Sequence, residues 1–193
     1  MPFKMREEFW TSVLAMVFAE LRESRWRDQI LRISIQTRSA KCQLGDLLPF
    51  SLDTNVWMCT DWHPALEERA VGPQKSSTSA PPECKGQPDL WVEDAENVLL
   101  VENKTTANAR PQQEDQYSRC LKSARAFAGK KKALFYAIPR TYLGPGNLLE
   151  QRFLAAGGDA DVTRGLLLWD ETLKGTVRDV LGLSEWFLQG FPS

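Results

Sequence analysis

Residues 88–104 read PDLWVEDAENVLLVENK, and this stretch predicts a β-hairpin. The segments 89–93 and 98–104 are of strand length and rich in large apolar residues, while the polar residues 94–97 between them are typical of a turn. The run VLLV in the second segment looks the most buried of the whole chain. The hairpin is therefore expected to lie in the core of the fold.

The register of this hairpin brings charged side chains together. If the turn is centred between Ala95 and Glu96, Asp89 faces Glu102 across the two strands. Directly opposed residues of an antiparallel pair point to the same face of the sheet, with Cβ atoms about 4.5–5.5 Å apart. Lys104 joins that face because side chains repeat every second residue along a strand.

Two neighbouring carboxylates repel each other unless a cation lies between them, and oxygen ligands favour a divalent ion such as Mg²⁺ or Mn²⁺. We therefore expect Asp89 and Glu102 to hold a metal ion, with Lys104 placed to orient an attacking water or to steady negative charge on a phosphate. The alternative is an ordinary solvated hairpin face. Against it, Glu102 and Lys104 directly continue the apolar run, where unpartnered charges are costly.

The rest of the chain alternates helical and strand patterns. Apolar spacing predicts a helix over 5–24, Pro111 opens a second helix that ends near Gly129, and Asp170 can cap a last one. Strand patterns occupy 31–36, 56–62, 133–138 and 165–169, and the last two look buried on both faces. This order predicts an α/β fold in a single domain over 1–193, with a central mixed β-sheet flanked by helices and a flexible loop at 71–87.

Length and net charge limit the number of domains and the kinds of partner that the chain can attract. The 193 residues suit one globular domain, and 24 basic against 25 acidic residues give a net charge of −1. No global field draws such a chain to nucleic acid or to anionic lipid, so any attraction of this kind must be local. Neither a signal-peptide pattern nor an apolar run of spanning length occurs, which predicts a cytoplasmic protein with no membrane partner.

The cysteines form no CxxC pair. Cys42, Cys59, Cys84 and Cys120 are irregularly spaced, which favours free thiols over a disulfide framework. A zinc site that combines the first three with His63 is the alternative, although neither end has the tight spacing usual in such sites.

Several of these residues together resemble the signature of the PD-(D/E)xK nuclease superfamily, the restriction-endonuclease-like fold. The resemblance rests on Pro88 and Asp89, followed by Glu102, Asn103 and Lys104 on the second strand. Gln113 and Tyr117 match the QxxxY element that several branches of the superfamily carry on the next helix. In the first helix, Glu7 and Thr11 are similar to an ExxxT motif of related sequences.

The resemblance implies a Mg²⁺- or Mn²⁺-dependent endo- or exonuclease that acts on nucleic acid, with DNA favoured over RNA, by in-line attack of a metal-activated water. It implies that Asp89 and Glu102 bind the metal, that the backbone carbonyl of Asn103 is a further ligand, and that Glu7 or Glu8 supplies an extra carboxylate. Gln113 would approach Glu102 or the substrate phosphate, and the Tyr117 hydroxyl would hydrogen-bond near the site. The alternative is that Tyr117 is simply the first core residue of its helix and Gln113 a solvated neighbour.

Positive charge is concentrated in one part of the chain. Residues 102–132 carry eight basic and three acidic side chains, so a basic patch near the proposed site is expected to position phosphates. Arg110, Arg119 and Lys122 are the predicted phosphate contacts. Residues 130–132, all lysines, could instead complement the dipole of the preceding helix.

Two other functions stay open at this point. One is a nuclease-like nucleic-acid-binding or assembly module that has lost the chemistry, and the other is a domain with no nucleic-acid role. A homodimer would suit a nuclease, because dimers are common where both strands are cut. A protein partner in a larger complex is a further possibility.

Overall fold

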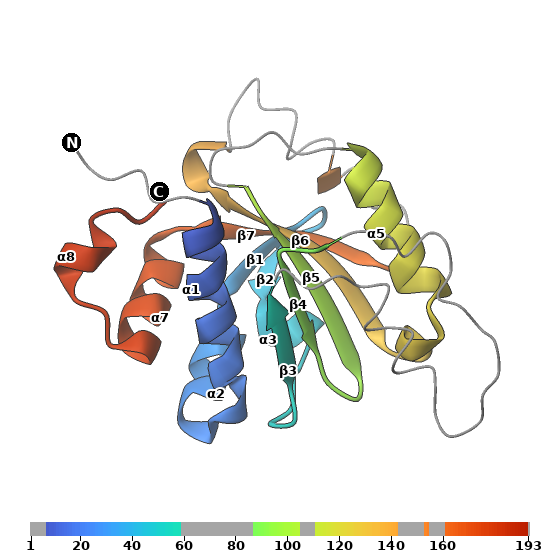
Figure 1. Ribbon diagram of the computed structural model, residues 1–193, viewed down its shortest axis with the longest axis horizontal. Coiled ribbons are helices and arrows are strands. Elements are labelled where there is room, and N and C mark those ends of the chain that lie inside the picture. Colours follow the sequence, from blue (N-terminus) through green and yellow to red (C-terminus); the bar gives the residue numbers. More distant parts are fainter. Residues whose placement is uncertain (1–6, 59–86, 105–110, 143–152, 155–160, 193) are drawn as a thin grey trace.

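The computed structural model describes residues 7–58, 87–104, 111–142, 153–154 and 161–192. These residues form one α/β domain built on a seven-stranded mixed sheet with helices on both faces (Figure 1). The predicted fold class is confirmed.

The sheet combines a parallel centre with antiparallel edges. The strand order across the sheet is β2 (Lys41–Gln43), β1 (Ser34–Thr37), β7 (Thr163–Trp169), β6 (Lys131–Pro139), β5 (Asn97–Asn103), β4 (Leu90–Glu93) and β3 (Asn55–Met58). The pairs β5–β6 and β6–β7 are parallel, and the other neighbours are antiparallel. The carboxyl ends of the three parallel strands therefore meet at one edge, where ligands of open α/β sheets usually bind.

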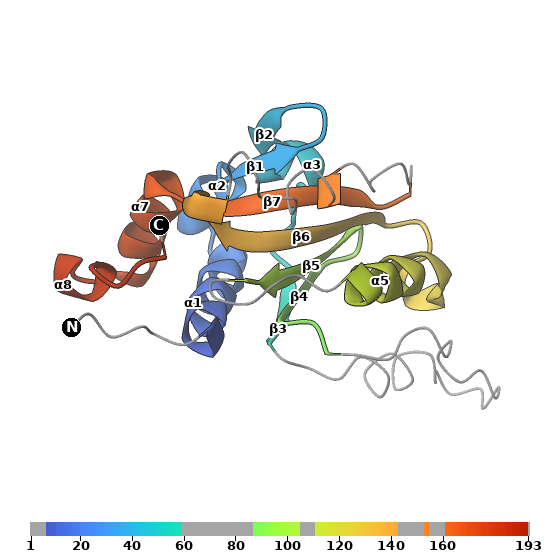
Figure 2. The ribbon, with the colours of Figure 1, turned by 90° about the horizontal axis from the view of Figure 1, so that it is seen from above.

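Helices cover the two faces of the sheet unequally. The described helices are α1 (Glu7–Ala19), η1 (Glu20–Arg22), α2 (Ser24–Leu31), α3 (Leu44–Leu47), α5 (Pro111–Ser123), η2 (Arg125–Phe127), η3 (Arg140–Tyr142), α7 (Glu171–Leu181) and α8 (Glu185–Leu188). Helices α1, α2 and α7 pack on one face of the sheet, and α5 packs on the other (Figures 1 and 2).

Alternation along the strands fills a separate core on each face. On β5, Leu99 and Val101 pack in the core beneath α1, whereas Val98 and Leu100 pack beneath α5. Every residue of 133–138 on β6 is likewise buried, which confirms the prediction of a strand covered on both faces.

The last long helix begins as expected. Oδ1 of Asp170 accepts the backbone N–H groups of Thr172 and Leu173, both at 3.0 Å, so Asp170 caps α7. The helix ends at Gly182, whose φ of +64° is a left-handed conformation that suits glycine.

Other element boundaries in the structure differ from the predicted ones. The expected helix over 5–24 ends at Ala19, followed by one 3₁₀ turn and the unpredicted α2. The expected strand at 31–36 begins only at Ser34, because Leu31 is still the last residue of α2. The predicted strand at 56–62 corresponds to β3, which covers Asn55–Met58, and residues 59–62 lie outside the described residues. Almost all of the predicted flexible loop at 71–87 also lies outside the described residues.

The cysteine prediction is partly wrong. Cys42 is a free thiol, but Cys120 on α5 is disulfide-bonded. Cys59, His63 and Cys84 lie outside the described residues, so the zinc alternative is not tested. Among the helices that the structure describes, none is long and apolar enough to cross a membrane.

Candidate functional site

The β4–β5 hairpin has the predicted register. Leu90 pairs with Val101 and Trp91 with Leu100, so the position before Leu90 lies beside Glu102. Asp89 directly precedes β4, and its Oδ2 accepts the backbone N–H of Asn103 at 2.7 Å. This hydrogen bond holds the Asp89 carboxylate at the carboxyl end of β5.

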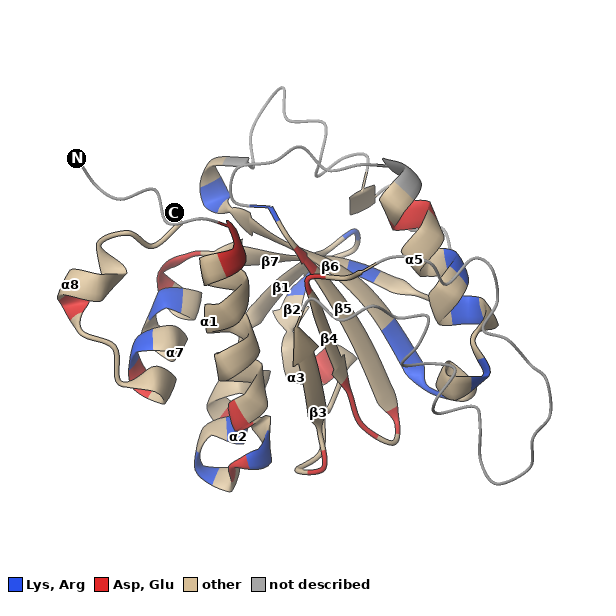
Figure 3. Ribbon diagram, in the orientation of Figure 1, with Lys and Arg blue, Asp and Glu red and all other residues tan. Residues whose placement is uncertain are grey.

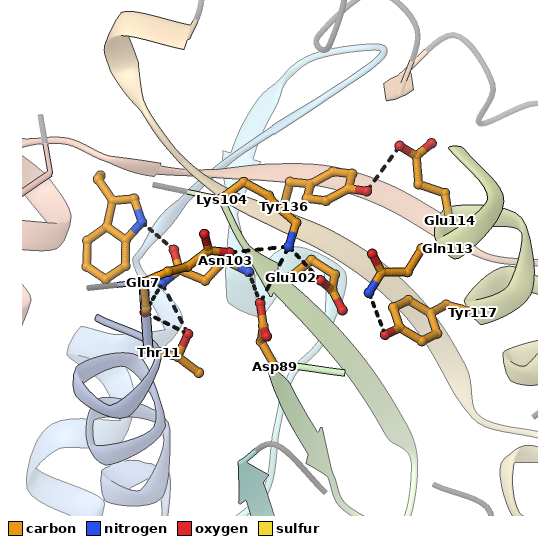
Figure 4. Close-up of polar contacts among 11 residues, drawn as sticks. Glu7, Thr11, Asp89, Glu102, Asn103, Lys104, Gln113, Glu114, Tyr117 and Tyr136 are labelled. Carbon is orange, nitrogen blue, oxygen red and sulfur yellow. Dashed lines mark hydrogen bonds and ion pairs between the residues drawn. The ribbon is translucent and has the colours of Figure 1, made fainter. Parts of the chain in front are cut away.

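Three carboxylates from separate parts of the fold surround the ammonium group of Lys104. Nζ of Lys104 lies 3.0 Å from Oε2 of Glu102, 3.3 Å from Oε1 of Glu7 and 3.9 Å from Oδ2 of Asp89 (Figure 4). Glu7 is in the first turn of α1, where a negative charge interacts favourably with the helix dipole. Glu7 is thus the first-helix acid that contacts the site, whereas Glu8 is exposed and its charge acts on Asp89 from farther away.

The cluster is buried on one side and open on the other. The side chains of Glu102 and Lys104 are 2% and 11% exposed, whereas those of Asp89 and Glu7 are 26% and 21% exposed. Asp89 and Glu7 are therefore the carboxylates of the cluster that contact solvent.

Burial and mutual repulsion disturb the titration of this cluster. Burial, reinforced by the charge of Asp89, raises the pKa of Glu102 to about 7, even though Lys104 and Tyr117 act in the opposite direction. Burial also raises the pKa values of Glu7 and Asp89. With three carboxylates around one ammonium group, the ionised site has an excess of negative charge.

Gln113 and Tyr117 lie on the face of α5 that is turned toward Glu102. Nε2 of Gln113 donates a hydrogen bond to the Tyr117 hydroxyl oxygen at 2.8 Å (Figure 4). The Tyr117 hydroxyl interacts with Glu102 and lowers the pKa of that carboxyl group. Tyr117 is also buried in the core beneath α5. It is therefore both a core residue and a residue whose hydroxyl group contacts the site.

The side chain of Asn103 holds α1 against the sheet. Its Nδ2 donates to the backbone carbonyl of Glu7 at 3.0 Å and to Oγ1 of Thr11 at 3.2 Å, and its Oδ1 accepts the indole N–H of Trp169 at 3.1 Å. This amide therefore positions the turn that carries Glu7. The predicted metal ligand is the backbone carbonyl of Asn103, and that role stays a prediction.

The donor set suits a cation that needs few protein ligands. Oε1 of Glu102 is buried without a well-formed hydrogen bond to the residues that the structure describes, and such an oxygen is a natural ligand for a metal ion. Within the described ranges, no group of three or more Asp, Glu, His or Cys side chains could hold a metal ion. Mg²⁺ commonly binds through one or two carboxylates together with water and phosphate oxygens, so Asp89 and Glu102 fit it and a closed structural site does not.

The basic residues are spread more widely than expected. Arg110 lies outside the described residues, and Arg119 and Lys122 are exposed on α5. Lys and Arg segments are spread over α2, α5 and α7 (Figure 3). Residues 131–132 lie at the start of β6, beside Asn97 and at the opposite end of β5 from Glu102. Lys130 forms a 2.6 Å ion pair with the buried Glu93. Residues 130–132 therefore lie away from the carboxylate cluster, and these three lysines do not belong to the basic patch that was predicted around it.

Sequence reasoning missed a second group of polar residues beside the site. Glu114, Tyr136 and Arg164 are buried in the core beneath α5 and interact with one another. A glutamate on the apolar side of a helix and an arginine directly before the buried run GLLLW are the signals that could have revealed them.

No known protein family, curated protein or solved structure matches the chain.

Proposed function

We propose that this protein is a Mg²⁺- or Mn²⁺-dependent nuclease that hydrolyses phosphodiester bonds, in DNA rather than RNA. The observation that supports the proposal is the convergence of Glu7, Asp89 and Glu102 on Lys104 at the carboxyl end of β5. The proposal also agrees with the resemblance of these residues to the PD-(D/E)xK nuclease superfamily.

Each member of the cluster has a separate task in this proposal. Asp89 and Glu102 would hold the metal ion, and Glu7 would support the site as a nearby carboxylate. A divalent ion bound there lowers the pKa of a coordinated water and screens the charge of a phosphate. Lys104 lies close enough to the carboxylates to orient the water and to stabilise negative charge that develops on the phosphate.

Burial of Glu102 supports this assignment. An ionised carboxylate in an apolar setting is costly, and its raised pKa near 7 shows how weakly the metal-free protein stabilises that charge. A cation that binds Oε1 and the neighbouring Asp89 would remove this cost. Tyr117 and Gln113 would then keep the Glu102 carboxylate in one orientation.

The test is cleavage of DNA and of RNA by the purified protein with Mg²⁺ or Mn²⁺. Lys104→Met keeps the length of the side chain and removes its charge, and it is expected to lower the rate by about 100-fold or more. Lys41→Ala changes an exposed lysine on the outer strand β2 and is expected to leave the rate unchanged. Absence of cleavage of either nucleic acid by the wild type, or equal rates for Lys104→Met and wild type, would contradict the proposal.

The second candidate is a nuclease-like module that binds nucleic acid or a protein partner without cleavage. It is favoured by the contact of Lys104 with all three carboxylates, because an internal ammonium group partly neutralises the site without a metal. Calorimetry with Mn²⁺ separates the candidates. Binding that is lost in Asp89→Ala supports the nuclease, whereas absence of Mn²⁺ binding together with salt-dependent retention on DNA supports the module.

A further inference from the structure

A buried polar network lies beside the site, on the same helix as Gln113 and Tyr117. Oε1 of Glu114 accepts a hydrogen bond from the Tyr136 hydroxyl at 3.0 Å (Figure 4), and its Oε2 lies 3.7 Å from Nη1 of Arg164. Nη2 of Arg164 donates to Oγ of Ser118 at 3.2 Å. The network thus joins α5 to β6 through Tyr136 and to β7 through Arg164.

Simple core packing does not account for these charges. The side chains of Glu114 and Arg164 are 4% and 6% exposed, so both groups have lost most of their hydration. Nε and Nη1 of Arg164 make no hydrogen bond with the residues that the structure describes, although the guanidinium lies 5.4 Å from the ring centroid of Phe153. Apolar side chains of similar volume often give equal or greater stability than a buried ion pair of this kind. Such a pair is better suited to fixing a geometry.

That geometry is connected to Glu102 from two directions. Tyr136 is the direct neighbour of Glu102 in the parallel β5–β6 ladder. Glu114 lies between Gln113 and Tyr117 in the first two turns of α5, and Tyr117 interacts with Glu102. A shift of this part of α5 along the sheet would therefore move the Tyr117 hydroxyl relative to Glu102.

We propose that Glu114 and Arg164 are positioning residues, which hold the first two turns of α5 on β6 and β7 so that the Gln113–Tyr117 pair meets Glu102. The effect on catalysis rests on the proposed function, but the fixing of α5 does not. The two parts are therefore tested separately.

The first test uses metal-free protein. Glu114→Gln keeps the shape of the side chain and an acceptor for Tyr136, but removes the charge that Arg164 requires. Backbone amides of residues 115–119 are expected to exchange with solvent about tenfold faster in this variant, whereas those of α7 keep their wild-type rates. Asp115→Asn, at the exposed neighbouring position of α5, is the control and is expected to leave both sets unchanged. Unchanged exchange of 115–119 in Glu114→Gln would overturn the positioning role whether or not the protein is a nuclease.

The second test uses the nuclease reaction. Glu114→Gln and Arg164→Met are each expected to lower kcat by about tenfold with little change in KM, as is usual when a residue that supports the site is lost. Arg164→Lys, which retains the charge, is expected to restore part of the activity. Glu114→Gln should have little further effect in a Tyr117→Phe background, because both changes disturb the same contact.

Full additivity with Tyr117→Phe, or losses that match a general fall in the thermal midpoint, would show that the network serves only stability and would overturn the catalytic part. Absence of cleavage by the wild-type protein would refute the proposed function and the catalytic part with it, while the exchange measurement would still decide whether the network fixes α5.

Discussion

Asn103 and Glu7 lie 96 positions apart in the sequence, and Nδ2 of Asn103 donates a hydrogen bond to the backbone carbonyl of Glu7 at 3.0 Å. The same amide group accepts the indole N–H of Trp169. One side chain at the end of β5 therefore sets the place of α1 and of β7 relative to the carboxylate cluster. The site depends on this amide even though its side chain has no proposed contact with a substrate.

Replacement of Asn103 by Ala is expected to reduce both stability and metal binding. The change leaves the buried Trp169 N–H without its acceptor, which should lower the free energy of unfolding by about 1–3 kcal/mol. It also frees the turn that carries Glu7, so Mn²⁺ should bind more weakly. Urea denaturation and calorimetry measure the two effects. Gln189→Ala, at an exposed position after α8, should alter neither, and a stable Asn103→Ala protein with wild-type Mn²⁺ affinity would refute the link.

Stability of the metal-free protein is expected to fall as the pH rises from about 4.5 to about 7. In this window the folded protein keeps a proton on Glu102, whose pKa burial raises from 4.5 to about 7, whereas the unfolded chain has already lost it. The folded state therefore binds more protons, and the free energy of unfolding decreases by up to about 1.4 kcal/mol per pH unit. Urea denaturation at several pH values, with a chelator present, measures this slope. In Glu102→Gln the slope should become shallower, and the raised pKa values of Glu7 and Asp89 account for what remains. An unchanged slope would assign it to groups other than Glu102.

A divalent ion should reverse this loss of stability. Mg²⁺ or Mn²⁺ requires the ionised carboxylates, so the ion is expected to raise the thermal midpoint more at pH 8 than at pH 6. At 100 times its dissociation constant, a ligand that binds only the folded state adds about 2.7 kcal/mol. Asp89→Asn should remove most of the effect, whereas Asp115→Asn, an exposed site on α5, should retain it. Equal stabilisation of both variants would place the ion elsewhere on the protein.

The part of the site that lies within one hairpin could be predicted from the sequence. Alternation with a period of two and a four-residue turn are enough to pair Trp91 with Leu100, and the position of Asp89 beside Glu102 follows from that register. The Gln113–Tyr117 contact is equally local, because residues four apart share a helix face.

Contacts between distant segments could not be predicted in this way. The pairing of Arg164 with Glu114 and of Trp169 with Asn103 depends on the strand order, which places β6 and β7 beside β5. The short helix α3 and strand β2 contain too few residues to show a period, so tertiary packing decides their conformation. The basic patch was predicted too broadly because charge was counted along the chain, whereas the parallel ladder places the start of β6 at the far end of β5.

Arg140 is expected to contact the nucleic-acid backbone, although the sequence around it gives no sign of such a role. It opens η3 directly after β6 ends, and Lys104 donates its backbone N–H to the carbonyl of Ala137 near the end of the same strand, at 2.8 Å. The exposed Arg140 thus lies at the edge of the sheet that carries the carboxylate cluster, and it has no ion pair with the residues that the structure describes. Arg140→Ala should weaken DNA binding to a similar degree for all sequences and lower the slope of log affinity against log salt by about 1.

The matched control for Arg140 is Arg38, which is also exposed but follows β1 at the opposite edge of the sheet, where Thr37 pairs with Gly165 near the start of β7. Fluorescence anisotropy with a labelled duplex at several salt concentrations compares Arg140→Ala with Arg38→Ala. A phosphate that reaches the carboxylate cluster passes the edge that carries Arg140 and not the edge that carries Arg38, so only the first variant should lose affinity. Equal losses of DNA affinity in the two variants would mean that DNA binds through diffuse surface charge and not at the edge of the sheet that carries the carboxylate cluster.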